Sequence, residues 1–287
     1  MGRFDSMQNQ SADRSRARRL FYLASIQRFL GRRARAAQLC HAALQCADYS
    51  KAHNMLAELE LPGEDYFRVL ARIHAHLRPA TYIEIGIDQG RSFEIVGAQT
   101  LTLGIDPNPR LHGPAGPLQR VFAQTSDDFF AGTDVRAELG GRSVDLAFID
   151  GMHQFEFAFR DFINIERYCT RDSAILIHDV YPIDAISAAR ERASSFWSGD
   201  IWRLILILKK YRPDLVVNTI GARPTGLGIV QNLDPGSTVL RERQDEIIAE
   251  FLAVDMPVQE VLKKEMLNHF PNDWPSIARL LDRKGRI

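Results

Sequence analysis

The sequence predicts an α/β protein with a mostly parallel sheet and helical regions at both ends of the chain. Three observations lead to this fold class. From residue 81 onward, short apolar segments alternate with helical ones, which is typical of parallel sheets. Four of the apolar segments end on or near a carboxylate. The last two are joined only by the residues GARPT, which is too short for a parallel crossover and predicts an antiparallel hairpin.

The region before the sheet is predicted to be mainly helical. Residues 1–13 are polar, and we expect them to be disordered. Residues 14–78 form a helical N-terminal region, with helices over 15–31, 33–47 and 50–60 and a fourth that ends before Pro79. The arginine-rich stretch from Arg14 to Arg35 carries apolar residues at helical spacing. This pattern favours packing on the same domain or on a partner over binding at a membrane surface.

Residues 35–59 (RAAQLCHAALQCADYSKAHNMLAEL) resemble a tetratricopeptide-like helical hairpin. A stable array needs about three such repeats, and this stretch holds at most one partial repeat. We therefore interpret it as a helical cap or an oligomerisation element, which is compatible with a homodimer formed through the helical extensions.

The sheet domain is predicted over residues 79–235, followed by a C-terminal helical extension over 236–287. Its seven strands are placed at 81–86, 101–106, 118–123, 144–150, 173–179, 215–220 and 226–232. Helices are placed near 91–99, 154–168, 184–195 and 200–211.

Composition limits the classes of partner and compartment. Lys and Arg total 36, as do Asp and Glu, and this balance gives no reason to expect a nucleic-acid partner. The three cysteines have no metal-like spacing, and such a low, odd count predicts a reducing, cytoplasmic environment. No apolar run approaches the roughly 18 residues that a membrane span requires. These features favour a small-molecule ligand or a protein partner.

Four carboxylates are predicted at the carboxyl ends of strands: Glu84, Asp106, Asp150 and Asp179. Open α/β sheets bind their ligands beyond these strand ends. A single acid there is explained by capping of the next loop, but four at one edge of a sheet indicate a functional cleft.

The first two acids suit a nucleoside that carries positive charge. Asp106 lies 20 residues after Gly86, where a carboxylate can bind both hydroxyls of a ribose. Gly86 and Gly90 permit close approach of a ligand, although a plain turn would also use them. A dinucleotide site prefers a third glycine where this chain has Glu84, and a carboxylate there would repel a pyrophosphate. The pattern therefore favours S-adenosyl-L-methionine, which has an ammonium and a sulfonium, over NAD.

The segments EIGIDQGRS, GIDPNP, DLAFIDGMHQFEFAFRD and AILIHDVYP together resemble class I S-adenosylmethionine-dependent methyltransferases, over about residues 81–233. In particular, the sequence resembles the methyltransferase-24-type subgroup beside macrocin-type and cephalosporin-hydroxylase-like O-methyltransferases. It implies a Rossmann-like seven-stranded methyltransferase sheet. It also implies cofactor contacts from Glu84, Gly86, Gly90, Ser92, Asp106 and Asp150, and from Ser126 and Asp127 at the adenine pocket.

The second pair of acids predicts a metal site. Asp150 and Asp179 should end neighbouring strands about 4.8 Å apart, where two carboxylates repel unless a cation lies between them. Mg²⁺ would satisfy them, and metal-dependent relatives use carboxylates from these strands. Here His178 precedes Asp179 where such relatives have a second acid, which makes a weak or unoccupied site an alternative. The candidate metal ligands are Asp150, Asp179 and His178.

His153 is the candidate general base for a hydroxyl acceptor, and it could equally cap the next helix. Asp150 is the second candidate catalytic residue. His153, Tyr181 and Trp202 are candidate substrate contacts, although packing of a helix start also explains Trp202.

These residues predict an O-methyltransferase, assisted by Mg²⁺, that acts on a hydroxyl of a sugar or a natural product. Two alternatives stay open at this point. One is a non-enzymatic interaction protein with a degenerate fold and a partner-binding helical N-terminus, and the other is an NAD-dependent oxidoreductase.

Overall fold

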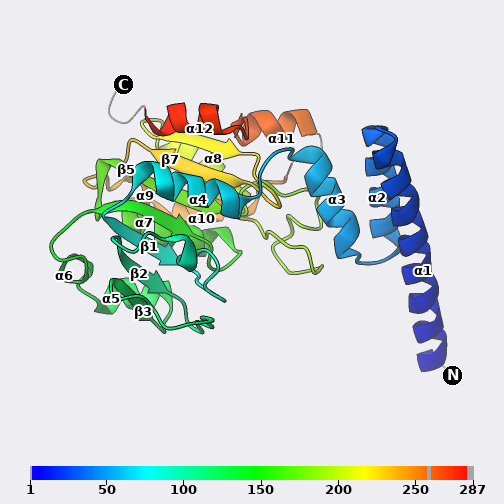
Figure 1. Ribbon diagram of the computed structural model, residues 1–287, viewed down its shortest axis with the longest axis horizontal. Coiled ribbons are helices and arrows are strands. Elements are labelled where there is room, and N and C mark those ends of the chain that lie inside the picture. The colour runs from blue at the N-terminus through cyan, green and yellow to red at the C-terminus, as the bar shows by residue number, and fades with distance from the viewer. Residues whose placement is uncertain (1, 257–259, 283–287) are drawn as a thin grey trace.

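One sheet of eight strands organises the chain in the computed structural model (Figure 1). The structure describes residues 2–256 and 260–282, with side chains from residue 12 onward. The strand order is β3-β2-β1-β4-β5-β7-β6-β8. The strands are β1 (Thr81–Ile85), β2 (Leu101–Ile105), β3 (Gln119–Phe122), β4 (Val144–Ile149), β5 (Cys169–His178), β6 (Val216–Ile220), β7 (Leu227–Gln231) and β8 (His269–Phe270).

Strands β1 to β5 run parallel, and β7 pairs antiparallel with both β5 and β6. This confirms the mostly parallel sheet with an antiparallel hairpin near its end. The predicted count of seven strands was one too low, because β8 pairs parallel with β6 beyond the hairpin. β8 contains only two residues, too few to leave a periodic signal in the sequence.

Side chains of alternating strand residues build a core on each face of the sheet. On one face, Leu146 and Phe148 of β4 pack with residues of α4 (Tyr66–Leu77) and α12 (Trp274–Leu281). On the other, Ala147 and Ile149 pack with α7 (Phe155–Glu166), α8 (Trp202–Tyr211) and α10 (Gln244–Leu252). Shorter helices are η1 (Phe93–Ile95), α5 (Ser126–Gly132), α6 (Val135–Glu138), α9 (Val239–Glu242) and α11 (Glu260–Met266).

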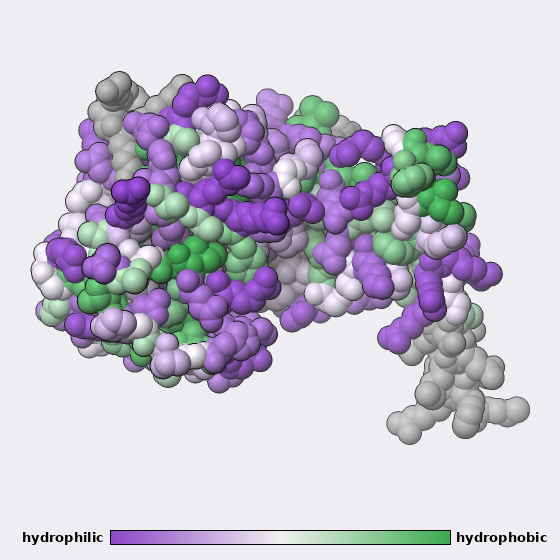
Figure 2. All heavy atoms as spheres, in the orientation of Figure 1, coloured by the Kyte–Doolittle hydropathy of each residue, from purple (hydrophilic) through white to green (hydrophobic). Residues whose placement is uncertain are grey.

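The N-terminal helices project from one side of the sheet domain (Figure 1). They are α1 (Gly2–Phe29), α2 (Arg33–Cys46) and α3 (Ser50–Glu60). α1 begins at Gly2, before the predicted start at residue 15. Disorder was expected over residues 1–13, and the side chains of most of these residues lie outside the described part of the structure. Figure 2 shows hydrophobic side chains gathered at one end of these helices. The exposed large hydrophobic residues of the chain include several in the last turns of α1 and just after it: Tyr22, Leu23, Ile26, Phe29 and Leu30.

Two predicted helices of the sheet domain were wrong. Residues 91–99 form only the single turn of η1, and residues 184–195 form a series of turns. The remaining predicted helices of the domain are present as α7 and α8. Within the described residues, no helix combines the length and apolar character needed to cross a membrane.

Candidate active site

The turn after β1 lies directly against the end of β4. Gly86 has φ +86°, and a Cβ there would lie 2.1 Å from the carbonyl oxygen of Asp150. The backbone N–H of Asp150 donates to Ile85 O at 2.8 Å. Gly86 is therefore required because the two strand ends pack backbone to backbone and the turn adopts a left-handed conformation.

Glu84 is fully buried beneath this turn. Its carboxyl oxygens accept hydrogen bonds from Ser92 Oγ at 2.5 Å and from Tyr82 OH at 3.0 Å. Burial raises the pKa of Glu84 to about 8, aided by the negative charges of Asp150 and Asp106 and opposed by these two hydrogen bonds. Glu84 and Ser92, both predicted as cofactor contacts, hydrogen-bond to each other in this structure.

Asp106, at the end of β2, organises the same turn. Its Oδ2 accepts from the backbone N–H groups of Ile87 at 2.9 Å and Asp88 at 2.8 Å. Its Oδ1 accepts from Asn108 N at 2.7 Å. Glu84 and Asp106 therefore face the same turn from adjacent strands. Gly90 closes this turn with φ +82°, and its N–H donates to Ile87 O.

The predicted adenine-side residues lie at the start of α5. Asp127 forms a two-point ion pair with Arg160 of α7, at 2.7 and 3.0 Å. Ser126 donates to the buried Asp161. Burial raises the pKa of Asp161 to about 7, against this hydrogen bond. Both predicted residues are therefore held by α7 in this structure.

The second pair of acids forms a compact cluster with a histidine at the ends of β4 and β5. Oxygens of Asp150 and Asp179 and a ring nitrogen of His153 lie within 4.8 Å of one another. A hollow of about 10 Å³ beside them offers the space of roughly one water molecule. Asp179 adopts φ +62°, and its Oδ1 accepts from Thr225 Oγ1 at 2.5 Å.

His178 lies between the two carboxylates. Its Nδ1 is 3.0 Å from Asp150 Oδ1 and 3.5 Å from Asp179 Oδ2, and its ring contacts Tyr66 with 3.9 Å between centroids. Burial would lower the pKa of His178, but the two carboxylates raise it to about 10. A protonated ring donates hydrogen bonds to both carboxylates. The group of possible ligand atoms that the structure brings together contains Asp150, His153 and Asp179, and does not include His178.

His153 is held by the long segment that follows β5. Its ring stacks on Trp197 with centroids 5.0 Å apart, and its Nδ1 faces Trp197 O and Asp179 Oδ2, both at 3.2 Å. Burial alone would raise the pKa of Asp179, but His178 and His153 hold it below its usual range, so it stays a carboxylate. Because Nδ1 faces two acceptors, we assign its proton there, which leaves Nε2 as the basic nitrogen.

Two predicted substrate contacts lie in the core instead. Tyr181 is fully buried, with Lys263 Nζ 4.5 Å from its ring centroid, and Trp202 is 1% exposed at the start of α8. Conversely, no sequence pattern pointed to Tyr66, Trp197 or Thr225, which come from three separate parts of the chain and meet at the cluster only after folding.

Part of the chain is similar to a known family of domains, and the chain is also similar to several solved structures. A family model described as a methyltransferase domain matches residues 83–180. No curated protein sequence matches the chain. Among solved structures, cofactor-bound Rv0187 from MTB is similar at 17% identity and a TM-score of 0.44, covering 63% of this chain and 88% of that one.

Two further similar structures are O-methyltransferases. TomG from Streptomyces achromogenes, in complex with SAM, has 13% identity and a TM-score of 0.43, covering 58% of this chain and 79% of that one. The O-methyltransferase from Bacillus cereus, in complex with SAH, has 12% identity and a TM-score of 0.40, covering 61% and 86%.

The family match spans the whole stretch from the middle of β1 to the residue after Asp179, and so contains the turn after β1 and both acidic strand ends of the cluster. This stretch is therefore similar to a methyltransferase domain, in agreement with the resemblance seen in the sequence.

Proposed function

We propose that the chain transfers the methyl group of S-adenosylmethionine to a hydroxyl oxygen of a small molecule, a sugar or a natural product, with assistance from Mg²⁺. One observation carries this proposal. The turn between Glu84 and Gly90 and the cluster of Asp150, His153 and Asp179 share one edge of the sheet, and Gly86 packs on the backbone of Asp150. A donor bound at the turn would therefore have its methyl group near groups able to activate an acceptor.

The turn supports binding of the donor in two ways. Asp106 lies at the end of β2, where a carboxylate can accept hydrogen bonds from ribose hydroxyls. Its Oδ1 accepts only one described hydrogen bond, from Asn108, which leaves acceptor capacity for a ligand. The carboxylates of Asp106 and Asp150 beside the turn also favour a cationic donor over a phosphate-containing one.

His153 would act as the general base. In the transfer, the acceptor oxygen bonds to the methyl carbon, and the bond from that carbon to the sulfonium sulfur breaks, its electron pair going to sulfur. The hydroxyl proton passes to Nε2 of His153. Asp179, bound to Nδ1, orients the ring and stabilises the positive charge that the ring gains.

The cluster also fits a hard divalent ion. Two carboxylates from adjacent strand ends, with space for water beside them, match the oxygen ligands that Mg²⁺ prefers. Asp150 and Asp179 would hold the ion. When bound, Mg²⁺ would lower the pKa of an acceptor hydroxyl and so ease loss of its proton.

Calorimetry with S-adenosylhomocysteine tests the donor site. We expect binding in the micromolar range, weakened at least about 30-fold in Asp106→Ala because the turn loses its anchor and the ribose loses a partner. The exposed Asp172→Asn serves as the matched control. If S-adenosylhomocysteine does not bind and NADH does, the proposal fails.

Thermal unfolding with added Mg²⁺ tests the metal without an acceptor. Millimolar Mg²⁺ should raise the unfolding temperature of the wild type by roughly 2 °C, through mass action. Asp150→Asn and Asp179→Asn should lose this shift, whereas Asp172→Asn should keep it. Once an acceptor is known, Asp150→Asn and Asp179→Asn should each lower the rate of methyl transfer at least about 100-fold. Undiminished turnover in EDTA would remove the ion from the mechanism.

A further inference from the structure

The long helix α1 carries two apolar faces, and only one of them is packed in the structure. The residues of the packed face recur at intervals of three or four and belong to the core: Ala17, Leu20, Phe21 and Ala24. Phe21 contacts Tyr49 edge-on, with 5.4 Å between the ring centroids. The sequence favoured packing of this helix over binding at a membrane surface, and packing accounts for this face alone.

The second face, called the free face below, consists of the exposed residues Tyr22, Leu23, Ile26, Phe29 and Leu30. These residues also recur at helical spacing, and residues two apart, such as Ala24 and Ile26, lie on nearly opposite sides of a helix. Tyr22 is 67% exposed and Phe29 is 90% exposed. α1 forms the outer edge of the molecule, on the side away from the sheet (Figure 1). The free face therefore meets no other part of the chain that the structure describes.

The surroundings of the free face are strongly basic. Between residues 12 and 47 the chain has eight arginines and a single acid, Asp13. Arg28 is paired with Glu58 of α3. Four other arginines are exposed, and their side chains form no ion pair or hydrogen bond with any described residue: Arg14, Arg16, Arg18 and Arg19. By helical spacing, Arg16 and Arg18 flank the free face on its two sides, and Arg19 lies within it.

This distribution of charge argues against a second copy of the chain as the occupant of the free face. In a two-fold contact, the same patch of both copies meets itself. The arginines around the two patches would then approach one another, and Asp13 is the only acid between residues 12 and 47 that could compensate them. Like charges brought together in this way destabilise the contact.

An anionic lipid surface fits both the apolar and the basic character of this helix. Interfacial helices insert aromatic and aliphatic side chains at the headgroup boundary, while arginines beside them reach the negatively charged headgroups. A protein partner would need a furrow with acids along both edges to match the arginines on both flanks. A bilayer supplies negative charge on both sides without such a furrow, and a flat surface can reach the outermost helix without meeting the sheet domain (Figure 1).

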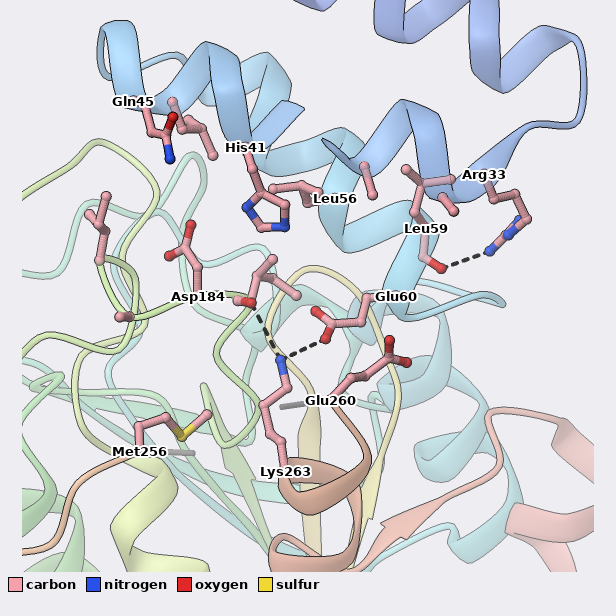
Figure 3. A pocket seen from close by; sticks show the side chains of 16 residues that line it. Arg33, His41, Gln45, Leu56, Leu59, Glu60, Asp184, Met256, Glu260 and Lys263 are labelled. Carbon is pink, nitrogen blue, oxygen red and sulfur yellow. Dashed lines mark hydrogen bonds and ion pairs between the residues drawn. The ribbon is translucent and has the colours of Figure 1, made fainter. Parts of the chain in front are cut away.

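The helices that carry the free face are joined to the sheet domain through polar contacts. Arg33, at the start of α2, donates to Leu59 O of α3 at 2.7 Å. Glu60, at the end of α3, pairs with Lys263 Nζ of α11 at 2.7 Å (Figure 3). Binding of α1 to a surface would therefore bring the sheet domain to that surface as well.

We propose that the free face of α1 binds the surface of anionic lipid bilayers. Tyr22, Ile26 and Phe29 would insert among the headgroups, and the arginines on the two flanks would contact negatively charged lipid. This site is separate from the methyl-transfer site, and its existence does not depend on the proposed methyl transfer.

Co-sedimentation of the full chain with lipid vesicles tests the proposal. We would compare vesicles of about three parts phosphatidylcholine to one part phosphatidylserine with vesicles of phosphatidylcholine alone, in about 0.1 M NaCl. We expect at least about tenfold tighter binding to the anionic vesicles, and loss of most of this preference in about 1 M NaCl, because salt screens the arginines. Equal binding to the two kinds of vesicle would overturn the proposal. No binding to the anionic vesicles would also overturn it, in favour of a protein partner.

Variants with matched controls locate the binding surface. Phe29→Ser should weaken binding to the anionic vesicles about tenfold, whereas Val261→Ser, at a 76% exposed position of α11, should not. Arg18→Gln and Arg19→Gln should each weaken this binding about fivefold, with the exposed Arg241→Gln as their control. Circular dichroism checks the folding of each variant.

Two outcomes of the variant measurements would refute this site. In one, Phe29→Ser binds the anionic vesicles as tightly as wild type does, so that another surface must contact the lipid. In the other, sedimentation velocity detects a dimer of the wild type that Phe29→Ser abolishes, so that a second copy covers the free face.

Discussion

The fold removes the carboxyl group of Glu84 from water completely, and two donors among the described residues hydrogen-bond to it. Desolvation disfavours its charged form, and Asp150 and Asp106 add further negative potential. The donor hydroxyls come from Tyr82 on the same strand and Ser92 beyond the turn, so the side chain ties the two ends of the turn together. This role is structural and needs hydrogen bonds more than it needs charge.

The raised pKa of Glu84 predicts a stability that depends on pH. An acid whose folded pKa lies above its unfolded value contributes stability that is complete below the unfolded pKa and is lost as pH rises through the folded one. Between pH 5 and pH 9, the free energy of unfolding should fall by on the order of 3 kcal/mol because of Glu84. Urea unfolding of the ligand-free protein at several pH values measures this.

The Glu84→Gln variant has an amide that can still accept hydrogen bonds but does not titrate. The fall in the free energy of unfolding between pH 5 and pH 9 should therefore be much smaller in this variant. Asp161, whose pKa is raised to about 7 by burial, adds a loss of the same sign, and Asp161→Asn separates the two contributions. Parallel pH profiles for Glu84→Gln and wild type would contradict the pKa shift of Glu84.

At the scale of elements, the strands could be predicted because each is an apolar run with a clear end, and the short GARPT linker indicates an antiparallel hairpin. The structure of the segment after β5 could not be predicted. Its alanines and arginines favour a helix locally, but Asp184 binds His53 of α3 and Ser187 N, and the indole of Trp197 donates to Ala189 O. These long-range and turn contacts outweigh helix propensity.

The candidate site could likewise be predicted only in part from the sequence. The four acids were predictable because strand ends of a parallel sheet meet at one edge. The orientation of His178 was not, because alternation along β5 directs it to one face while the left-handed backbone at Asp179 lets the next carboxylate reach back to it. The burial of Tyr181 and Trp202 depends on helices that come from distant parts of the chain.

The segment after β5 positions His153, and this gives a prediction for Trp197. Removing the indole in Trp197→Ala should lower kcat roughly tenfold, because the imidazole loses its stacking partner and samples other orientations. Affinity for S-adenosylhomocysteine should not change.

Trp197→Phe, which can still stack on the imidazole, should recover most of the rate. His153→Ala should be slower than wild type by at least about 100-fold. Equal rates for Trp197→Ala and wild type, with any acceptor that is methylated, would contradict this arrangement.

At the scale of the whole molecule, one buried ammonium joins three parts of the chain that are far apart in sequence. Lys263 of α11 pairs with Glu60 at the end of α3 and donates to the carbonyls of Pro182 and Ile183 after β5. The helical extensions and the segment beside the cluster of Asp150, His153 and Asp179 are thereby fixed to one another. Because the ammonium is almost fully buried, its loss would leave Glu60 and two carbonyls without a partner.

Lys263→Met therefore predicts a large loss of stability. A buried pair broken by removal of one partner typically costs about 3–5 kcal/mol, and since Glu60 is 15% exposed we expect about 3 kcal/mol at pH 7 in urea unfolding. The double variant Glu60→Leu and Lys263→Met removes both charges, so it should be more stable than Lys263→Met alone. Proteolysis of Lys263→Met should cut first near residues 182–187, which lose their anchor. The control Lys264→Met, whose side chain pairs with the exposed Glu260, should stay within about 0.5 kcal/mol of wild type. A Lys263→Met protein as stable as wild type would show that the three parts are held together by apolar packing alone.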